Sequence, residues 1–501
     1  MTFNIFSKKD ILIFIVAIAA VVYITTAFNS HGFYHADEHY QIIEFAGLKL
    51  GTHTPDELAW EFKAQIRPSF QPFICFVLLK TFKFITINNP YNQALILRLL
   101  TALFAIVAIF YFIQNTKNFI KNKYIKIAYY LLSFFLWFIP IISVRFSSET
   151  WSGLFFLLSL TYFIKDPNNK RTPYKIGIFF GISFLFRFQI AFAILGFGLW
   201  LLIIKHSKLK YLVKICTLFC AVLFIGFLLD SWFYGKFVFT PWKYFLSVIE
   251  SGGNGFGTSP WYFYIIKLVT YPSYFIGIPL LLSLVLILFY KRNSFLLWCI
   301  IPFVLIHSFV PHKEERFLFP IIYLFPLIII EGYTIFLNLC QIHLVVRFIN
   351  YFIVTIFVLV NAVGIIAMGQ KSAGIGRMEI TKYIHDKYGN ENINLIFCSW
   401  ANPYNPWHSL PVKFYLENSL TDHRINNLCE LNDSLFRKNA VNLLVIRKID
   451  TNNIECSRKI KNYNLIFEKQ SIPKWIERIN AKYKGFNNRN ILELYRHPNS
   501  E

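Results

Sequence analysis

Charged side chains are scarce in this 501-residue chain. Asp, Glu, Lys and Arg make up 15% of it, against roughly 25% in a soluble domain. The eight cysteines form no CxxC pair and no His/Cys cluster at metal-ligand spacing, so the sequence predicts no metal site. Internal repeats, heptads and low-complexity tracts are also lacking. What the chain has instead is 55% hydrophobic residues, the composition of a protein that lies in lipid.

Apolar runs near 20 residues predict about eleven membrane-spanning helices. The predicted spans are 11–28, 91–114, 126–144, 149–164, 174–187, 189–204, 211–229, 266–290, 294–310, 316–337 and 348–368. If the N-terminus is cytoplasmic, the basic segments between the spans fall on the cytoplasmic side, as is usual for membrane proteins. The formal net charge of +23 therefore reflects the basic loops that keep these segments in the cytoplasm. We expect no nucleic acid partner.

The same topology assigns two long loops, 29–90 and 230–265, to the outer face. Parts of the first loop have helix-like spacing without being long enough to span. We predict that these helices lie in the plane of the membrane interface. They cover residues 36–50, 56–64 and 69–85.

The chain changes character near residue 370, where the spanning runs end and Asn becomes frequent. We therefore predict a membrane domain over 1–370 and a small soluble α/β domain over 371–501, also on the outer face. The predicted elements of this tail are buried strands at 393–397, 441–446 and 465–468, and a helix at 377–387. Three of the cysteines lie in the tail, so one disulfide is possible there with one thiol left over.

An acidic segment follows the first span closely and reads His35-Ala36-Asp37-Glu38-His39-Tyr40-Gln41. In a structural interpretation, Asp37 is the N-cap of the next helix and Glu38 is solvated. In a functional interpretation, one carboxylate is a general base that faces a hydroxyl substrate. Gln41 lies one helical turn beyond Asp37, so both side chains can meet one ligand.

A run of charged residues, His312-Lys313-Glu314-Glu315-Arg316, separates two very apolar spans on the outer side. Positive residues are not favoured there, and a helix N-terminus follows, which favours anions. We therefore prefer a phosphate-binding cluster to a solvated turn. Arg98 and Arg187 lie near the outer ends of other spans, and each needs an anionic partner, either a carboxylate such as Glu149 or a bound phosphate.

Glycine and aromatic residues alternate near the end of the second outer loop, from Gly255 to Tyr264. Glycine permits close approach of the backbone to a ligand, and Trp261 can stack on a sugar ring. An aromatic belt at the membrane interface explains the same residues equally well.

Taken in order, these blocks resemble the lipid-phosphate-mannose-dependent α-mannosyltransferases of glycosyltransferase family 22, in the GT-C superfamily. His312–Phe317 is similar to the family's His-Lys-Glu-x-Arg-Phe motif, the most specific of the matches. The other similar blocks are His35–Glu38 with Gln41 and Glu44, Trp60–Phe62, Ile66–Ser69, Ser147–Thr150, Arg187–Gln189, Asp230–Gly235 and Gly257–Tyr262. The chain departs from the family pattern at Ala36, Phe62, Ser259 and Tyr262.

The resemblance implies a polytopic α-helical GT-C fold and an inverting transfer of mannose from a polyprenyl-phosphate donor. The acceptor would be a hydroxyl of a lipid-linked molecule or glycan, and neither a cofactor nor a metal would be required. Asp37, or else Glu38, would take the acceptor proton. The donor phosphate would be bound by His312, Lys313, Arg316, Arg67 and Arg187. Other substrate contacts would come from His35, Gln41, Glu61, Glu149 and Trp261.

We expect a bacterial inner membrane protein with a periplasmic active site, or an endoplasmic reticulum protein with a lumenal one if the source is eukaryotic. A transporter or flippase for a lipid-linked sugar is the first alternative, but it predicts charges at the bilayer midplane and repeated halves. The second is a GT-C transferase of another sugar, such as arabinose or aminoarabinose.

Overall fold

The computed structural model describes residues 8–251, 257–340, 344–406, 410–416 and 419–498. The chain divides into two compact units, each built from separate stretches of sequence. Unit 1 contains residues 1–26, 64–74 and 97–369, and unit 2 contains residues 27–63, 75–96 and 370–501. The part of the predicted Gly255–Tyr264 motif at residues 255 and 256 lies outside the described residues.

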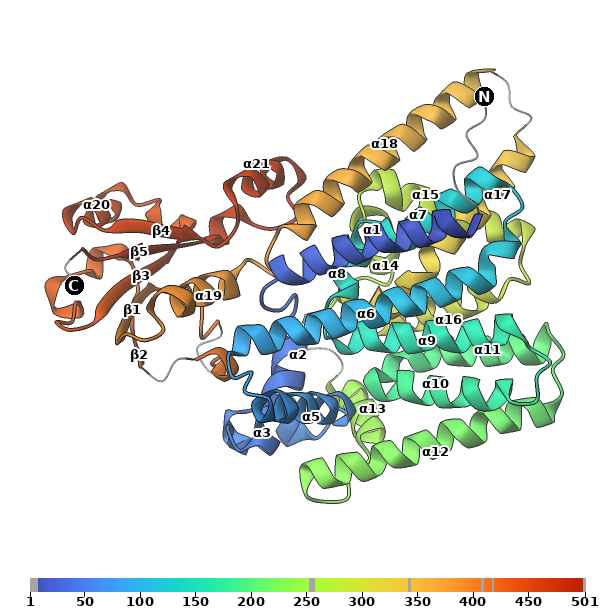
Figure 1. Cartoon of the computed structure of the whole chain (residues 1–501), viewed down its shortest axis with the longest axis horizontal. Coiled ribbons are helices and arrows are strands. Elements are labelled where there is room, and N and C mark those ends of the chain that lie inside the picture. The colour runs from blue at the N-terminus through green and yellow to red at the C-terminus, as the bar shows by residue number, and fades with distance from the viewer. Residues whose placement is uncertain (1–7, 252–256, 341–343, 407–409, 417–418, 499–501) are drawn as a thin grey trace. The chain divides into compact units, whose positions relative to one another are not determined.

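Unit 1 consists of helices (Figure 1). Helix α10 packs against α9 and α12, α11 packs against α16, and α15 packs against α17. The helices are α1 (Lys8–Asn29), α6 (Pro90–Thr116), α7 (Lys123–Phe135), α8 (Phe138–Ser143), α9 (Ser148–Lys165), α10 (Thr172–Phe186), α11 (Ala191–Ile203), α12 (Leu209–Tyr234), α13 (Thr240–Ser251), α14 (Phe263–Thr270), α15 (Tyr274–Tyr290), α16 (Phe295–Phe309), α17 (Phe325–Leu339) and α18 (Leu344–Gly369). Three 3-10 helices join some of them: η3 (Lys117–Phe119), η4 (Phe188–Ile190) and η5 (Glu315–Leu324).

Five helical stretches among the described residues are long and apolar enough to cross a membrane. They are Ile11–Asn29, Pro90–Phe119, Leu209–Tyr234, Glu315–Leu339 and Val346–Gly369. Four shorter apolar helices accompany them, and α12 and α18 leave most of their apolar surface exposed. The chain is therefore a multi-pass membrane protein. The exact number of spans stays a prediction.

Two predicted spans are each divided into two helices. The span 126–144 breaks between α7 and α8, and Asn361 of α18 bridges the break. Its side-chain amide donates to the Phe135 carbonyl (2.6 Å) and accepts from the Trp137 backbone N–H (2.8 Å). The span 266–290 breaks before α15, and there the Trp137 indole donates to the Pro272 carbonyl (3.0 Å). Side chains thus satisfy the backbone groups that each break releases, which a lipid environment requires.

The first outer loop forms short helices, as its spacing predicts. Segment 36–50 contains α2 (Ala36–His39), the π-helix η1 (Tyr40–Glu44) and α3 (Phe45–Leu50). Segment 56–64 is covered by the end of the 3-10 helix η2 (Pro55–Glu57) and by α4 (Trp60–Ala64), and segment 69–85 by α5 (Phe70–Phe84). Helix α13 lies within 230–265, where the sequence predicts a loop.

The tail forms a five-stranded sheet of order β2-β1-β3-β5-β4. Strand β1 (Ile393–Cys398) is parallel to β2 (Leu420–Ile425) and β3 (Val441–Arg447), and β5 (Leu492–Arg496) is antiparallel to β3 and to β4 (Ile466–Gln470). Helices α19 (Arg377–Tyr388), α20 (Ile454–Asn462) and α21 (Lys474–Tyr483) accompany the sheet. The 3-10 helices are η6 (Lys413–Tyr415), η7 (Leu428–Glu430), η8 (Asp433–Leu435), η9 (Lys448–Thr451) and η10 (Asn488–Asn490).

The predicted α/β character of the tail is correct, with two differences. Strands β2 and β5 were not predicted, because β2 is largely exposed and β5 carries charged residues. The third predicted strand begins one residue later, at Ile466, and its first two residues are exposed rather than buried. Their exposure follows from the place of β4 at the edge of the sheet.

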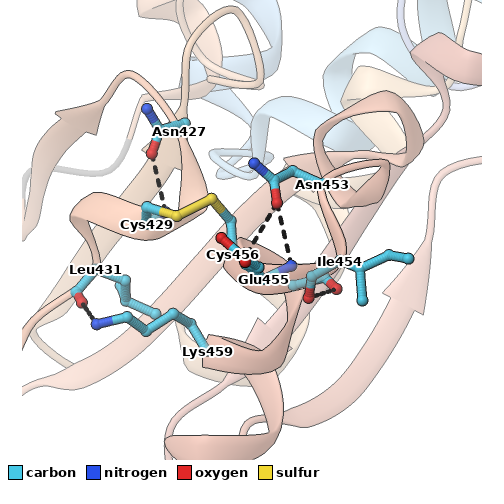
Figure 2. Close-up of a disulfide and its surroundings, with 9 residues drawn as sticks. Asn427, Cys429, Leu431, Asn453, Ile454, Glu455, Cys456 and Lys459 are labelled. Carbon is cyan, nitrogen blue, oxygen red and sulfur yellow. Dashed lines mark hydrogen bonds between the residues drawn. A yellow bond between two sulfur atoms is a disulfide. The ribbon is translucent and has the colours of Figure 1, made fainter.

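A disulfide joins Cys429 of η7 to Cys456 of α20 (Figure 2). Each cysteine lies in the first turn of its helix, after an asparagine that caps that helix. Asn427 accepts from the Cys429 N–H (2.9 Å), and Asn453 accepts from the Cys456 N–H (3.3 Å). Cys398 is the remaining thiol of the tail and is buried in β1.

Candidate active site

The acidic segment of unit 2 begins helix α2, and its cap differs from the sequence prediction. His35, not Asp37, is the N-cap, and its Nδ1 accepts from the Asp37 backbone N–H (3.3 Å). Asp37 therefore lies in the first turn, with its carboxylate 3.5 Å from His35 Nδ1. The N-cap interpretation of Asp37 was wrong because a histidine side chain can also accept at this position.

Glu38 is buried, and its carboxylate accepts from the Tyr34 backbone N–H (2.9 Å). It is not the solvated residue of the structural interpretation. Asp37, by contrast, remains partly exposed. A general base must approach its substrate, so the local structure favours Asp37 over Glu38.

Gln41 and Glu61, both predicted as substrate contacts, bind each other in unit 2. The Gln41 amide donates to the Glu61 carboxylate (2.7 Å), and both side chains are buried. The π-helical turn at Tyr40–Glu44 changes the register after α2, so the one-turn spacing between Asp37 and Gln41 expected for an α-helix does not apply.

Glu44 is the centre of a buried ionic cluster that the sequence did not predict. It forms ion pairs with His39 (2.6 Å) and His53, and it accepts from the Phe414 backbone N–H (3.2 Å). Burial raises the pKa of Glu44, but the two histidines outweigh it and hold that pKa at about 2. Glu44 thus joins the first outer loop to the tail within unit 2.

Unit 1 contains a buried cluster of arginines around Glu149. Ser147 caps α9 by accepting from the Thr150 N–H (3.3 Å), and this cap places Glu149 in the first turn. Arg316 donates to the Glu149 carboxylate (2.9 Å), and Arg187 lies 3.3 Å from the same oxygen. All three side chains are at most 7% exposed.

A close approach of η5 to α9 makes this contact possible. One turn after Glu149, a Cβ atom at Gly153 would lie 2.7 Å from the Pro320 carbonyl oxygen. Only glycine allows this spacing. Arg316 lies at the start of η5, and an ion pair with Glu314 also holds its side chain.

The remaining residues of the charged run connect it to the second outer loop. Lys313 donates to the Ser259 carbonyl (2.7 Å), and the Ser259 N–H donates to the Pro311 carbonyl (3.0 Å). His312 lies 2.9 Å from the Glu314 carboxylate. Two residues beyond Ser259, Trp261 is 65% exposed, as a residue that contacts a sugar or a membrane must be.

Arg67 belongs to the same unit, and a motif far away in sequence, Asp230–Gly235, holds its segment. The Asp230 carboxylate accepts from the Ser69 N–H and hydroxyl, both at 2.7 Å. The Tyr234 hydroxyl donates to the Arg67 carbonyl (2.8 Å). The Arg67 guanidinium lies 5.9 Å from the Tyr244 ring centre. It is also close enough to Arg187 for the two positive charges to repel each other.

The predicted residues thus gather in two groups, one in each compact unit. Unit 1 holds the predicted phosphate-binding residues, which are Arg67, Arg187, His312, Lys313 and Arg316, together with Glu149 and Trp261. Unit 2 holds His35, Asp37, Glu38, Gln41 and Glu61. Sequence reasoning gave no role to His39, although it lies in the acidic segment, nor to His53 and Tyr244, which stand in no motif that signals their partners. Among the described residues, no group of His, Cys, Asp or Glu has the geometry of a metal site.

Comparison with known proteins identifies the family. The model of the Alg9-like mannosyltransferase family matches residues 12–417, most of the chain. The chain belongs to this family. The predicted membership in glycosyltransferase family 22 and the predicted mannosyltransferase activity are both confirmed.

Individual family members are similar over shares of different size. GPI mannosyltransferase 3 of Candida albicans is 24% identical over 409 residues, which cover 80% of this chain and 75% of that protein. Alpha-1,2-mannosyltransferase ALG9 of Saccharomyces cerevisiae is 35% identical over 121 residues, which cover 23% of this chain and 21% of that protein.

Among solved structures, the crystal structure of ArnT from Cupriavidus metallidurans bound to undecaprenyl phosphate is similar in fold. The TM-score is 0.55 at 11% sequence identity, and the match covers 97% of this chain and 98% of ArnT. The predicted GT-C fold is confirmed by this likeness.

Proposed function

We propose that the chain transfers mannose, with inversion, from a polyprenyl-phosphate-mannose donor to a hydroxyl of a lipid-linked or glycan acceptor on the outer face of the membrane. The observation that carries the proposal is a cluster of basic side chains in unit 1. Arg187 and Arg316 are buried and share one carboxylate oxygen of Glu149, and Arg67 and Lys313 belong to the same unit. A guanidinium cluster of this kind is a typical binding site for phosphate.

A phosphodiester suits this cluster. Its oxygens only accept hydrogen bonds, and arginine offers planar pairs of donors that match them. The likeness in fold to a protein solved with undecaprenyl phosphate is consistent with a lipid-linked phosphate. A donor anchored in the bilayer would present its phosphate near the membrane surface, where we place this cluster by the distribution of basic residues.

The proposed reaction needs one base and one stabilised leaving group. The Asp37 carboxylate takes the proton of the acceptor hydroxyl, whose oxygen attacks C1 of mannose from the face opposite the phosphate. The bond between C1 and the phosphate oxygen breaks, and polyprenyl phosphate leaves with the electron pair. Arg316 and Arg187 stabilise the negative charge that grows on the phosphate.

The test is transfer by purified protein from polyprenyl-phosphate-mannose to a panel of lipid and glycan acceptors, with products identified by mass spectrometry. Asp37→Asn should lower kcat by about 100-fold to 10,000-fold. Asp56→Asn is the matched control, because Asp56 is an exposed carboxylate of the same loop. Full activity of Asp37→Asn would remove Asp37 from the base role.

The donor side is tested with Arg316→Ala, which should raise KM for the donor more than KM for the acceptor. Arg292→Ala is its control, since Arg292 is exposed and lies in a predicted cytoplasmic loop. A larger effect on the acceptor would exclude Arg316 from phosphate binding.

The Cys429–Cys456 disulfide supports the outer location of the tail, since disulfides persist in oxidising compartments. Such a compartment is the periplasm in a bacterium or the endoplasmic reticulum lumen in a eukaryote. The test is labelling of Trp261→Cys with a maleimide that does not cross membranes. Label should be incorporated from the outer side only, and Arg292→Cys should show the opposite pattern. Labelling of Trp261→Cys from the cytoplasm alone would invert the topology.

A further inference from the structure

Two buried polar atoms near Phe317 have no hydrogen-bond partner within the described part of the chain. They are Nη2 of Arg187 and Nε2 of His307. The residues are 5% and 3% exposed. The hydroxyl of Tyr264, fully buried, interacts electrostatically with the Glu314 backbone but makes no hydrogen bond of standard geometry. Native structures rarely leave such atoms unsatisfied, so each indicates a ligand or an ordered water.

The three residues come from separate elements and are linked by ring contacts, from Tyr264 to His307, and from His307 to Phe317 beside Arg187. His307 of α16 has its ring centre 6.3 Å from that of Phe317 and 6.2 Å from that of Tyr264, which is on α14. The Arg187 guanidinium, after α10, lies 5.3 Å from the Phe317 ring centre, and so does that of Arg316. His307 therefore shares the Phe317 ring as a neighbour with both arginines, and Tyr264 packs on His307.

Their hydrogen-bonding roles are complementary. His307 Nδ1 lies 2.7 Å from the Phe303 carbonyl, which can only accept, so Nδ1 carries the proton. The rings packed on His307 supply no negative charge, so its imidazole is neutral and Nε2 is an acceptor. Arg187 Nη2 can only donate, and the Tyr264 hydroxyl can do both.

This pattern selects a hydroxyl group. A phosphodiester oxygen would satisfy Arg187 but offers no proton to His307. A hydroxyl accepts from Arg187 Nη2 and donates to His307 Nε2 at the same time. In the donor of the proposed reaction, the hydroxyls of mannose are attached through the sugar ring to the phosphate that the arginine cluster would bind.

We infer that Arg187, His307 and Tyr264 bind one hydroxyl of the donor sugar and so contribute to the choice of mannose. This inference rests on the proposed function. It adds His307 and Tyr264 to the site as specificity-determining residues, and it gives Arg187 a second contact besides the phosphate.

The experiment measures kcat/KM for polyprenyl-phosphate-mannose and for its 2-, 3-, 4- and 6-deoxy analogues. His307→Phe keeps the ring but removes Nε2, and it should lower kcat/KM for mannose by about 10-fold to 100-fold. For the one deoxy donor that lacks the bound hydroxyl, wild type and His307→Phe should be equal. Tyr264→Phe should single out the same analogue.

Tyr129→Phe is the matched control. It also removes a buried tyrosine hydroxyl, which is bonded to Thr116 at 2.7 Å on another part of unit 1. It should lower thermal stability without changing the ranking of the donors. If His307→Phe does not fold, Tyr264→Phe and the ranking of deoxy donors by wild type decide.

Equal losses of His307→Phe and Tyr264→Phe on every donor would indicate a structural water only and would overturn the inference. Equal use of all the deoxy donors by wild type would do the same. In both cases wild type still transfers mannose, so the proposed function survives. Absence of transfer by wild type with any acceptor would remove the proposed function, and the inference with it.

Discussion

The disulfide of the tail gives a stability prediction whose size follows from the chain itself. Cys429 and Cys456 are 27 residues apart in sequence. Closing a loop of that length removes entropy from the unfolded chain worth about 3.5 kcal/mol at 25 °C. For a domain of this size, such a loss lowers Tm by about 10 °C. We therefore expect Cys456→Ser, or reduction of wild type, to weaken the tail by this amount.

The assay is hydrogen–deuterium exchange of the full-length protein in detergent, because it reports on the tail without removing the membrane helices. Amides of β3 should exchange about 400-fold faster in Cys456→Ser, which is 3.5 kcal/mol expressed as an equilibrium ratio. Cys216→Ser is the control, since Cys216 is an exposed thiol of α12. If β3 exchanges at the same rate with and without reductant, the loop-closure argument is wrong. Labelling of both Cys429 and Cys456 by maleimide in unreduced protein would show that the bond is absent.

Three further predictions concern buried charges. Glu149→Gln leaves two arginines without their shared carboxylate, so it should destabilise the protein by about 3–5 kcal/mol, and added polyprenyl phosphate should raise its Tm more than that of wild type. Glu44→Gln should lower Tm at pH 7. The pKa of Glu44 is depressed to about 2, so its stabilising effect exists above pH 4.5 and is lost as pH falls toward 2, where the Tm difference should vanish. Asp230→Asn should weaken the hold on Ser69. It should raise the KM for the donor several-fold while Tm changes little, as measured by kinetics and thermal unfolding of the same sample.

The membrane helices were predictable because lipid imposes a simple rule of length and hydropathy on the chain. The interruptions inside two spans were not, because the groups that satisfy them come from elsewhere. Asn361 bridges the break beside Trp137 from more than 200 residues away. Hydropathy records no such pairing, and a continuous apolar run therefore predicted one helix where the structure has two.

For the site, residue type alone indicated the arginine cluster but not which side chains pair with each other inside it. The sequence left two partners open for Arg187, a carboxylate or a phosphate, and the structure shows the carboxylate of Glu149 in place. Periodicity also suggested Asp37 as a helix cap, and a single preceding histidine took that position. His307 carried no signal at all, since a lone histidine in an apolar span is ordinarily a core residue.

The contact of Asp230 with Ser69, and of Tyr234 with Arg67, has a practical consequence. Two short motifs more than 160 positions apart are held together by hydrogen bonds. A change of either motif that removes one of these groups leaves its partner in the other motif without a hydrogen bond. Engineering of this region therefore has to treat the two motifs as one part.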